Sequence, residues 1–405
     1  MNHKNNISLI GKECTGCGLC TEICPVGCLH MELNDEGFWF PQVNEVKCIH
    51  CGVCARSCPS QCHIELNKPT SVFAAASYDE EGSRLSSSGG VFYEAARYVI
   101  QELQGYVCGA ALDENLQLKY IVTNSMNDVE RMQGSKYIQS DICACYRTIK
   151  SYVLQHKKVL FCGTPCQVAG VKRFVGDADS LLTMDLVCHG TPSAAVFSEY
   201  MHTRYPEDRY IKFSFRQKNK HIKSLFAYQY FAIREKDKTM KGKCIRSDRD
   251  LFYYAFLKGY NYRESCYLCQ YAQSSRCGDI TIGDCANYRA YDLPINRELS
   301  TLCINTETGE KLWRAVSERF CYEEANYEME SRLNMQLHSP AKRPSQRNEF
   351  YRDLSELPWD VLQKKYCPSK SIKAEIKDFF IWHTTPKTRE KIKCFFRPNT
   401  VKQKR

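Results

Sequence analysis

Near its N-terminus the chain reads Cys14-Thr15-Gly16-Cys17-Gly18-Leu19-Cys20-Thr21-Glu22-Ile23-Cys24-Pro25. This is the spacing Cys-x2-Cys-x2-Cys-x3-Cys-Pro, and it returns in residues 48–59, shifted by 34 positions. Cys28 and Cys62, just beyond the two runs, coincide at the same shift. So many coincident positions at one shift indicate an internal repeat, which predicts a small N-terminal domain built around cysteine.

The run is the ligand pattern of bacterial ferredoxins, in which three thiolates of one run and the fourth cysteine of the other hold each 4Fe-4S cluster. The sequence therefore predicts two clusters. The ligands of the first are Cys14, Cys17, Cys20 and Cys58, and those of the second are Cys48, Cys51, Cys54 and Cys24. Zinc is the alternative, but a zinc site takes four ligands, usually from two Cys-x2-Cys knuckles. Cys28 and Cys62 are expected to pack beside the clusters as small apolar side chains.

The chain has 405 residues, of which 25 are cysteine. Disulfides on that scale would need an oxidising compartment and an export signal. No apolar signal core precedes Cys14, and no apolar run reaches the ~18 residues of a membrane span. We therefore expect a cytoplasmic protein whose cysteines stay reduced and bind metal.

The net charge of +10 is concentrated at the C-terminal end. Residues 331–405 hold 18 Lys and Arg against 7 Asp and Glu, which is +11 and leaves about −1 for the rest of the chain. A nearly neutral body without a recognised binding module argues against nucleic acid as a partner. An apolar stripe in the tail lies among lysines and consists of Ile372, Ile376, Phe379 and Phe380. Such a stripe packs on its own domain, docks on a partner, or makes peripheral contact with an anionic membrane.

The patterns beyond the cysteine repeat predict a multidomain α+β and α/β protein. Residues 67–89 are polar and Ser-rich, which is typical of a linker. Strand and helix patterns then alternate up to about residue 205, which predicts an α/β layer with parallel strands. Residues 210–234 alternate and are aromatic, which predicts antiparallel strands. The expected segments are a ferredoxin-like head, two parts of the α/β body with a small cysteine-rich subdomain in the second, and an appended basic tail, over residues 1–68, 72–160, 161–335 and 336–405.

Two similar turns follow strands of the α/β part, namely Gly163-Thr164-Pro165-Cys166-Gln167 and Cys188-His189-Gly190-Thr191-Pro192. Thr caps helices and Pro suits the first helical position. Helix N-termini at the carboxyl ends of parallel strands are where α/β folds bind anionic cofactors. Capping alone would explain either turn, but two copies with adjacent cysteines favour a binding site. Two further polar turns are weaker signals, since each is also typical of a loop: Ser86-Ser87-Ser88-Gly89-Gly90 and Gly134-Ser135-Lys136-Tyr137.

A third group of cysteines reads Cys266-x2-Cys269-x7-Cys277, and Cys285 follows. This spacing fits zinc or a third 4Fe-4S cluster, and two clusters upstream favour the cluster as an extension of an electron path. The fourth ligand would be Cys166 or Cys285. No acid–base constellation stands out among the ten histidines, and His189 is the one to test as a catalyst.

Taken together, these motifs resemble the beta subunits of coenzyme F420-reducing hydrogenase and F420-dependent formate dehydrogenase. The resemblance is closest to stand-alone bacterial relatives with a fused two-cluster ferredoxin domain, which often accompany polysaccharide-biosynthesis genes. It covers roughly residues 8 to 300, and it rests on the following pieces: Ser87-Ser88-Gly89-Gly90, Gly134-Ser135-Lys136-Tyr137, Gly163-Thr164-Pro165-Cys166-Gln167, Cys188-His189-Gly190, and Cys266-x2-Cys269 with Cys277 and Asp279.

The resemblance implies FAD in the domain that starts near residue 72, held by the residues of these turns. It also implies a 4Fe-4S cluster bound by Cys266, Cys269 and Cys277, with Cys166 as the fourth ligand. Relatives commonly read Gly-Asp-Phe-Trp-Gly after the last cluster cysteine, whereas this chain reads Gly283-Asp284-Cys285-Ala286-Asn287. The loss of that aromatic wall leaves the substrate open.

The expected function is therefore that of an iron–sulfur flavoprotein oxidoreductase. Electrons would pass between the ferredoxin-type clusters and FAD, and the flavin would exchange a hydride with an organic substrate, either coenzyme F420 or a polysaccharide precursor. A redox partner protein or a small electron donor would supply the electrons. The alternative is an electron-carrier or adaptor subunit that holds clusters but has no substrate site of its own.

Overall fold

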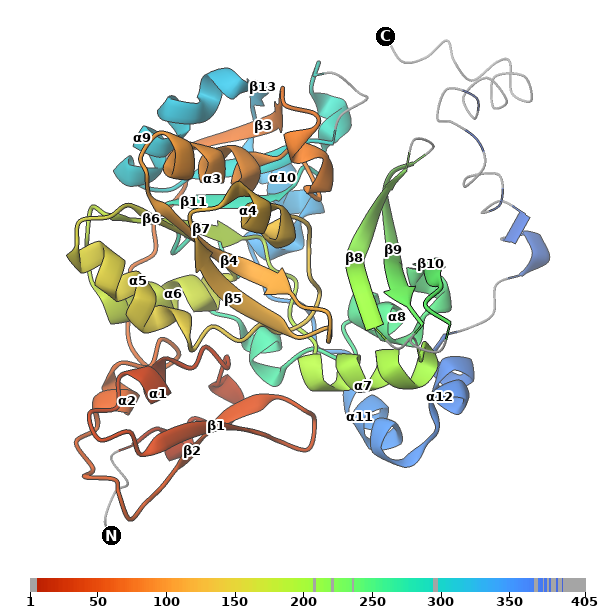
Figure 1. The fold of residues 1–405 in the computed structure, drawn as a ribbon, viewed down its shortest axis with the longest axis horizontal. Helices are drawn as coiled ribbons and strands as arrows, with labels where there is room; N and C mark the ends of the chain where they lie inside the picture. The colour runs from red at the N-terminus through yellow and green to blue at the C-terminus, as the bar shows by residue number, and fades with distance from the viewer. Residues whose placement is uncertain are drawn as a thin grey trace.

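The computed structural model describes residues 6–206, 209–219, 222–234, 237–293 and 298–367, together with 371–373, 375, 376, 379, 384 and 388. Within these residues the strands form a hairpin near the N-terminus, a central mixed sheet and a smaller antiparallel sheet (Figure 1). The fold is thus a mixed α/β multidomain one with a ferredoxin-like head, as the sequence predicts. No helix of the described residues combines the length and the apolar character needed to cross a membrane.

The head repeats one local structure, as its sequence does. Helix α1 (Leu19–Glu22) and helix α2 (Val53–Arg56) are single short turns, and each follows a glycine in the left-handed region, Gly18 at φ 73° and Gly52 at φ 71°. Glycine adopts this conformation without the steric cost of a Cβ atom. Between the two copies, β1 (Leu29–Leu33) and β2 (Trp39–Val43) form an antiparallel hairpin.

The central sheet has the strand order β13-β3-β12-β11-β7-β6-β4-β5 in the described residues. Its members are β3 (Ser71–Ser77), β4 (Tyr106–Leu112), β5 (Leu118–Thr123), β6 (Val159–Gly163), β7 (Leu181–Leu186), β11 (Ile280–Asp284), β12 (Ser300–Ile304) and β13 (Phe320–Glu324). The expected parallel layer is present in the middle, where β4, β6, β7 and β11 run parallel to their neighbours. Antiparallel strands extend it on both sides.

The prediction of a linker over residues 67–89 is wrong for the central part of that segment. Residues Ser71–Ser77 form β3, which pairs with β12 on one side and β13 on the other. The run between the two serines is apolar, and Ala74 and Ala75 have no exposed surface. A short strand buried on both faces shows no alternation, and its flanking serines concealed it.

Helices cover both faces of the central sheet, and neighbouring strand residues alternate between them. Leu160 and Leu182 pack under helices α3 (Val91–Gln101), α4 (Met126–Met132) and α9 (Glu307–Val316). Phe161 and Leu181 pack on the opposite side under α5 (Cys145–Leu154) and α6 (Pro165–Val175). The head lies against α5 and α6 (Figure 1).

The smaller sheet consists of β8 (Arg209–Asn219), β9 (Ile222–Ile233) and β10 (Met240–Arg246), all antiparallel, which confirms the prediction for residues 210–234. An aromatic core joins it to helices α7 (Ala194–Arg204) and α8 (Leu251–Lys258). Helix α10 (Tyr327–Leu333) follows β13 on the central sheet.

The tail expected over residues 336–405 is not a mere appendage at its start. Helices α11 (Arg347–Glu356) and α12 (Trp359–Tyr366) bury Phe350 and Leu362 in the same aromatic core as α7 and α8. Of the stripe proposed for membrane contact, Phe380 lies outside the described residues. Ile372, Ile376 and Phe379 are exposed, which leaves that hypothesis untested.

Candidate functional site

The thiols predicted to bind the first head cluster lie close together. Burial raises the pKa of the Cys20 thiol, and the neighbouring charges that raise it further are those of Cys17, Cys14, Cys58 and, last, Cys54 of the second set. Cys58 comes from the second run and is the ligand that the ferredoxin pattern lends. The donor set therefore suits a 4Fe-4S cluster, because its four sulfurs are gathered from both copies of the repeat.

Two thiols of the second predicted set, Cys24 and Cys48, lie near Cys28. The sulfur atoms of Cys24 and Cys28 are 3.5 Å apart, and the amide of Cys28 donates to the Cys24 sulfur. The pKa of Cys28 is raised to about 12, mainly by burial and further by the neighbouring thiols of Cys24 and Cys48. Cys28 is buried with Ile7 and Leu29, which agrees with the packing role expected from the sequence.

No group of three or more Cys, His, Asp or Glu side chains in the described residues is arranged to hold a single metal ion. A zinc ion would draw four thiolates to about 2.3 Å from one centre. A cubane carries its iron atoms at separate corners, so its four ligands stand further apart.

The third cysteine group differs from the predicted one. Burial raises the pKa of Cys166, and the charges that add to it are those of Cys269, Cys188 and Cys266. Cys188 in turn has Cys266 and Cys269 as its strongest charged neighbours. The structure therefore brings together Cys166, Cys188, Cys266 and Cys269 at the ends of β6 and β7 and in the segment after α8.

Cys277 and Cys285 point elsewhere. The Cys277 thiol donates to the carbonyl oxygen of Pro165 at 3.2 Å and lies 3.5 Å from a carboxylate oxygen of Asp185. Cys285 packs with alanines of β3 in a separate apolar cluster. Cys188 belongs to the second turn singled out in the sequence, but it was not predicted as a ligand there. Its place in that turn, next to His189, is the signal that could have identified it.

The turns singled out in the sequence converge on one cavity of about 440 Å³. It lies at the carboxyl ends of the parallel strands β6, β7 and β11, where α/β folds bind their ligands. The predicted cofactor residues that line it are Ser87, Ser88, Gly90, Gly134, Ser135, Lys136, Tyr137, Gly163, Thr164, Gln167, His189 and Gly190. Of those predicted, Gly89 and Pro165 do not line it.

Gly89 and Pro165 instead support the walls of the cavity. A Cβ atom at Gly89 would stand 2.0 Å from the carbonyl oxygen of Ala75, so the backbone there passes directly over β3. Pro165 is the buried first residue of α6. Thr164 and Gln167 form a capping box for α6, and Gln167 also accepts a bond from the hydroxyl of Tyr120 at 2.9 Å.

Two of the cavity's loops are tied to each other. The amide and the hydroxyl of Ser135 both donate to the hydroxyl oxygen of Ser87, at 2.6 and 2.8 Å. Helix α3 begins at Val91, directly after the loop that carries Ser87. The residue before the helix, Gly90, has a φ of 84°, and no side chain caps the N-terminus of α3. Ser88, Gly90 and the first residues of α3 line the cavity, so its free amides can receive an anion.

Two titratable groups face the cavity. Lys136 donates from Nζ to the carbonyl oxygen of Gln133 at the end of α4, and burial lowers its pKa to about 7. Burial also lowers the pKa of His189, against the opposing influence of Asp284. Lys136 can therefore hold or release a proton near neutral pH, whereas the environment of His189 favours its neutral form.

Aromatic side chains close one side of the cavity, and two of them, Phe256 and Tyr262, come from outside the predicted motifs. Tyr137 stacks on Phe256 at 4.4 Å between ring centroids, and Tyr262 lies beside Phe256. At the rim, Arg216 of β8 donates to Asp284 of β11 at 2.6 Å. Aromatic rings therefore line the cavity although residues 284–287 contain none.

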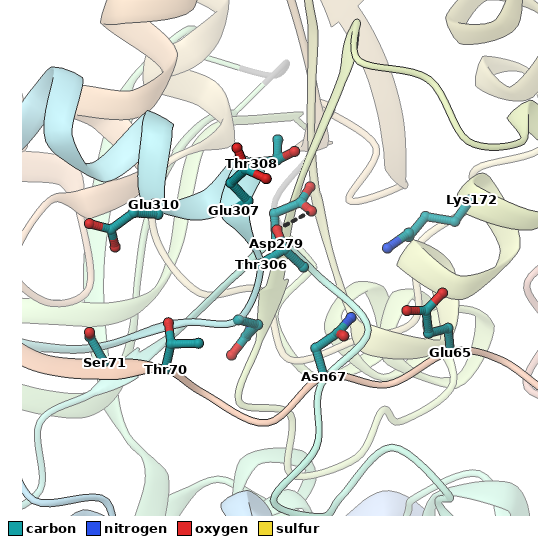
Figure 2. Close-up of a pocket in the computed structure, with 11 residues that line it drawn as sticks. Glu65, Asn67, Thr70, Ser71, Lys172, Asp279, Thr306, Glu307, Thr308 and Glu310 are labelled. Carbon is teal, nitrogen blue, oxygen red and sulfur yellow. Dashed lines mark hydrogen bonds between the residues drawn. The ribbon is translucent and has the colours of Figure 1, made fainter.

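A second hollow, of about 760 Å³ and open to solvent, lies between the segment that follows the head and the start of α9 (Figure 2). The hydroxyl of Thr306 donates to Asp279 across 2.7 Å there. Its lining includes Glu65, Glu307 and Lys172 but none of the predicted site residues. Its carboxylates disfavour an anionic cofactor, so the cavity at β6 and β7 is the better candidate.

Residues 156–330 match the family model described as the C terminus of the beta subunit of coenzyme F420 hydrogenase/dehydrogenase. This segment is a domain of that family. Residues 13–62 match the model of a 4Fe-4S dicluster domain. The chain thus joins an iron–sulfur domain to a beta-subunit domain of an oxidoreductase family, as the sequence predicts.

Among solved structures, the chain is similar to a chain of the F420-reducing NiFe hydrogenase complex from Methanosarcina barkeri, determined after xenon derivatization. The two are 17% identical, with a TM-score of 0.44, and the match covers 78% of this chain and 94% of that one. No curated protein matches the chain.

Proposed function

We propose that this protein is an iron–sulfur flavoprotein oxidoreductase that moves electrons between two head clusters, a third 4Fe-4S cluster and FAD. The single observation that carries the proposal is the cavity at the ends of β6 and β7. It collects almost every residue expected to hold FAD, and its wall includes Cys188 of the third thiol group. A cluster carrier without a substrate site would have no use for such a cavity.

For the third cluster we propose Cys166, Cys188, Cys266 and Cys269 as ligands. The electrostatic effect of these thiols on one another's pKa supports this set. Their position supports it as well, because Thr191, whose hydroxyl lies 3.8 Å from the Cys266 sulfur, also lines the cavity. A cluster bound here would adjoin the cofactor cavity. Cys277, with its bonds to Pro165 and Asp185, is instead a packing residue in this proposal.

The contact between head and body supports an electron route from the first head cluster. Tyr146 and Tyr271 are buried at this contact. The charges acting on each include that of Cys17 in the head and that of Cys166 in the body. Both rings therefore lie between the two predicted clusters, which makes the cluster bound by Cys14, Cys17, Cys20 and Cys58 the one next to the body.

The residues present fit FAD by three features. The free amides at the start of α3 and the loops joined by Ser87 and Ser135 suit phosphate groups. The apolar and aromatic side suits a flat ring. Lys136 and His189 line the cavity with lowered pKa values, and Lys136, whose pKa is about 7, suits proton exchange there. When bound, FAD would supply the conversion between single electrons and a hydride pair.

The substrate proposed first is coenzyme F420. Tyr137, Phe256 and Tyr262 offer a flat aromatic surface to a ring system. Arg216 at the rim offers a guanidinium to an acidic group, with Asp284 as its present partner. A polysaccharide precursor remains the second substrate class to be tested.

The test uses the full chain, purified without oxygen and reconstituted with iron, sulfide and FAD. We expect about twelve irons, from about four in each of three clusters, and bound flavin. Reduced coenzyme F420 should bleach the flavin absorbance. Flavin that dithionite bleaches but reduced F420 does not would redirect the search to sugar precursors. About eight irons without flavin would contradict the proposal and favour an electron carrier.

A further inference from the structure

Among the described residues three arginines are almost completely buried, and two of them have carboxylate partners. Arg276 donates to Asp185 at 2.9 Å. Arg347 pairs with Glu36 at 2.7 Å and with Glu264 at 2.8 Å. A buried guanidinium needs such a counter-charge, because leaving water is costly for an ion.

Arg263, the third, has none among the residues that the structure describes. Its side chain donates to the carbonyl oxygen of Cys14 at 2.5 Å, to that of Trp39 at 2.9 Å and to the side-chain oxygen of Gln139 at 3.3 Å. Its guanidinium also lies 4.2 Å from the centre of the Phe40 ring. All of these partners are neutral, and only 1% of the residue is exposed.

The position of Arg263 indicates where the missing negative charge belongs. A Cβ atom built on Gly16 would lie 3.0 Å from Nη1 of Arg263, so the guanidinium sits against the loop that carries Cys14 and Cys17. That loop supplies ligands of the first predicted head cluster. A 4Fe-4S cluster with four thiolates is an anion, and reduction by one electron makes it more negative.

We propose that Arg263 is the counter-charge of the head cluster bound by Cys14, Cys17, Cys20 and Cys58, and that it raises the reduction potential of this cluster above that of the other head cluster. This rests on the proposed function, which supplies the clusters. We call the cluster next to Arg263 the inner cluster and the other head cluster the outer one. One electron leaves the outer cluster and reduces the inner one. No proton moves, since arginine stays protonated. Arg263 is thus a positioning residue that holds the electron next to the body.

The test is an EPR-monitored potentiometric titration of the reconstituted full chain. Cys20→Ser and Cys54→Ser assign the two head signals. In Arg263→Gln we expect the ratio of reduced to oxidised inner cluster, measured at a fixed potential, to fall about tenfold. For a one-electron couple this corresponds to a reduction potential lower by about 59 mV. Arg263→Lys, which keeps the charge, should restore most of that ratio. The reduction potential of the outer cluster should not change in either variant.

A matched control is Arg147→Gln. Arg147 also bridges head and body, through Glu22 at 2.8 Å, but 73% of its side chain is exposed. It should leave both potentials unchanged. An unchanged potential in Arg263→Gln, or an equal shift in Arg263→Lys, would overturn the proposal, because both point to a structural role alone.

A second measurement needs no arginine variant and remains decisive if Arg263→Gln does not fold. In the wild-type chain the cluster lost in Cys20→Ser should titrate at the higher potential of the two. The reverse order would refute the role of Arg263. Failure of the proposed function is distinct, because it appears as missing iron or flavin before any titration.

Discussion

The hydroxyl of Tyr146 in α5 donates a hydrogen bond to the backbone carbonyl of Cys17 in the head, across 2.9 Å. Both residues are buried in one apolar cluster with residues of α6. Tyr146→Phe should keep the ring and lose only this bond. We expect the free energy of unfolding to fall by about 1 kcal/mol, with iron content unchanged, in denaturant titrations of the reconstituted chain. Loss of iron would show that the bond shapes the cluster loop itself.

The proposed ligand set of the third cluster makes Cys188 and Cys277 behave differently. Cys188→Ser should lower the iron content by about four atoms per chain and remove one EPR signal. Cys277→Ser should retain the full iron content, because its thiol bonds to Pro165 and Asp185. Cys285→Ser is the matched control in a separate apolar cluster. Equal iron loss in the Cys188 and Cys277 variants would reject the assignment.

We predict that flavin binding depends on pH through Lys136. Burial lowers its pKa to about 7, so the side chain is positive below that pH and neutral above it. A positive group attracts the phosphates of FAD. Flavin affinity should therefore fall roughly three- to tenfold between about pH 6 and about pH 8, measured by fluorescence quenching. Lys136→Met should bind weakly at both pH values, and an unaltered pH profile in that variant would exclude Lys136.

The ion pair of Arg276 and Asp185 is almost fully buried, with 1% and 0% of the side chains exposed. Arg276→Met leaves the Asp185 charge uncompensated in the core. We expect about 3–5 kcal/mol of destabilisation, visible in the midpoint of urea unfolding. Arg314→Met, which breaks an exposed pair with Glu310, should cost less than about 1 kcal/mol. Similar losses for both variants would contradict this account.

The spacing of cysteines predicted much of the head, because cluster ligands tolerate little variation in sequence. Cys20 and Cys58 lie together as the ferredoxin pattern requires. The flavin turns were individually weak, yet most meet in one cavity, since the carboxyl ends of β6 and β7 lie side by side. What could be predicted was therefore chemistry tied to fixed local spacing.

The parts that escaped prediction depend on contacts between distant segments. The alanines of β3 carry no pattern that distinguishes a buried strand from a small-residue loop. Cys188 joins Cys266 only because the segment after α8 returns to the end of β7. The helices α11 and α12 were included in the appended tail, since their burial depends on aromatic residues of α7 and α8.

The pair formed by Glu36 in the head and Arg347 in α11 spans 311 positions of the chain. During synthesis the head leaves the ribosome long before Arg347 has been made. The contact between Glu36 and Arg347 can form only after Arg347 has been made, which is later in the chain than every strand of the central sheet. The order of translation thus leaves the head without this restraint while the central sheet is being synthesised.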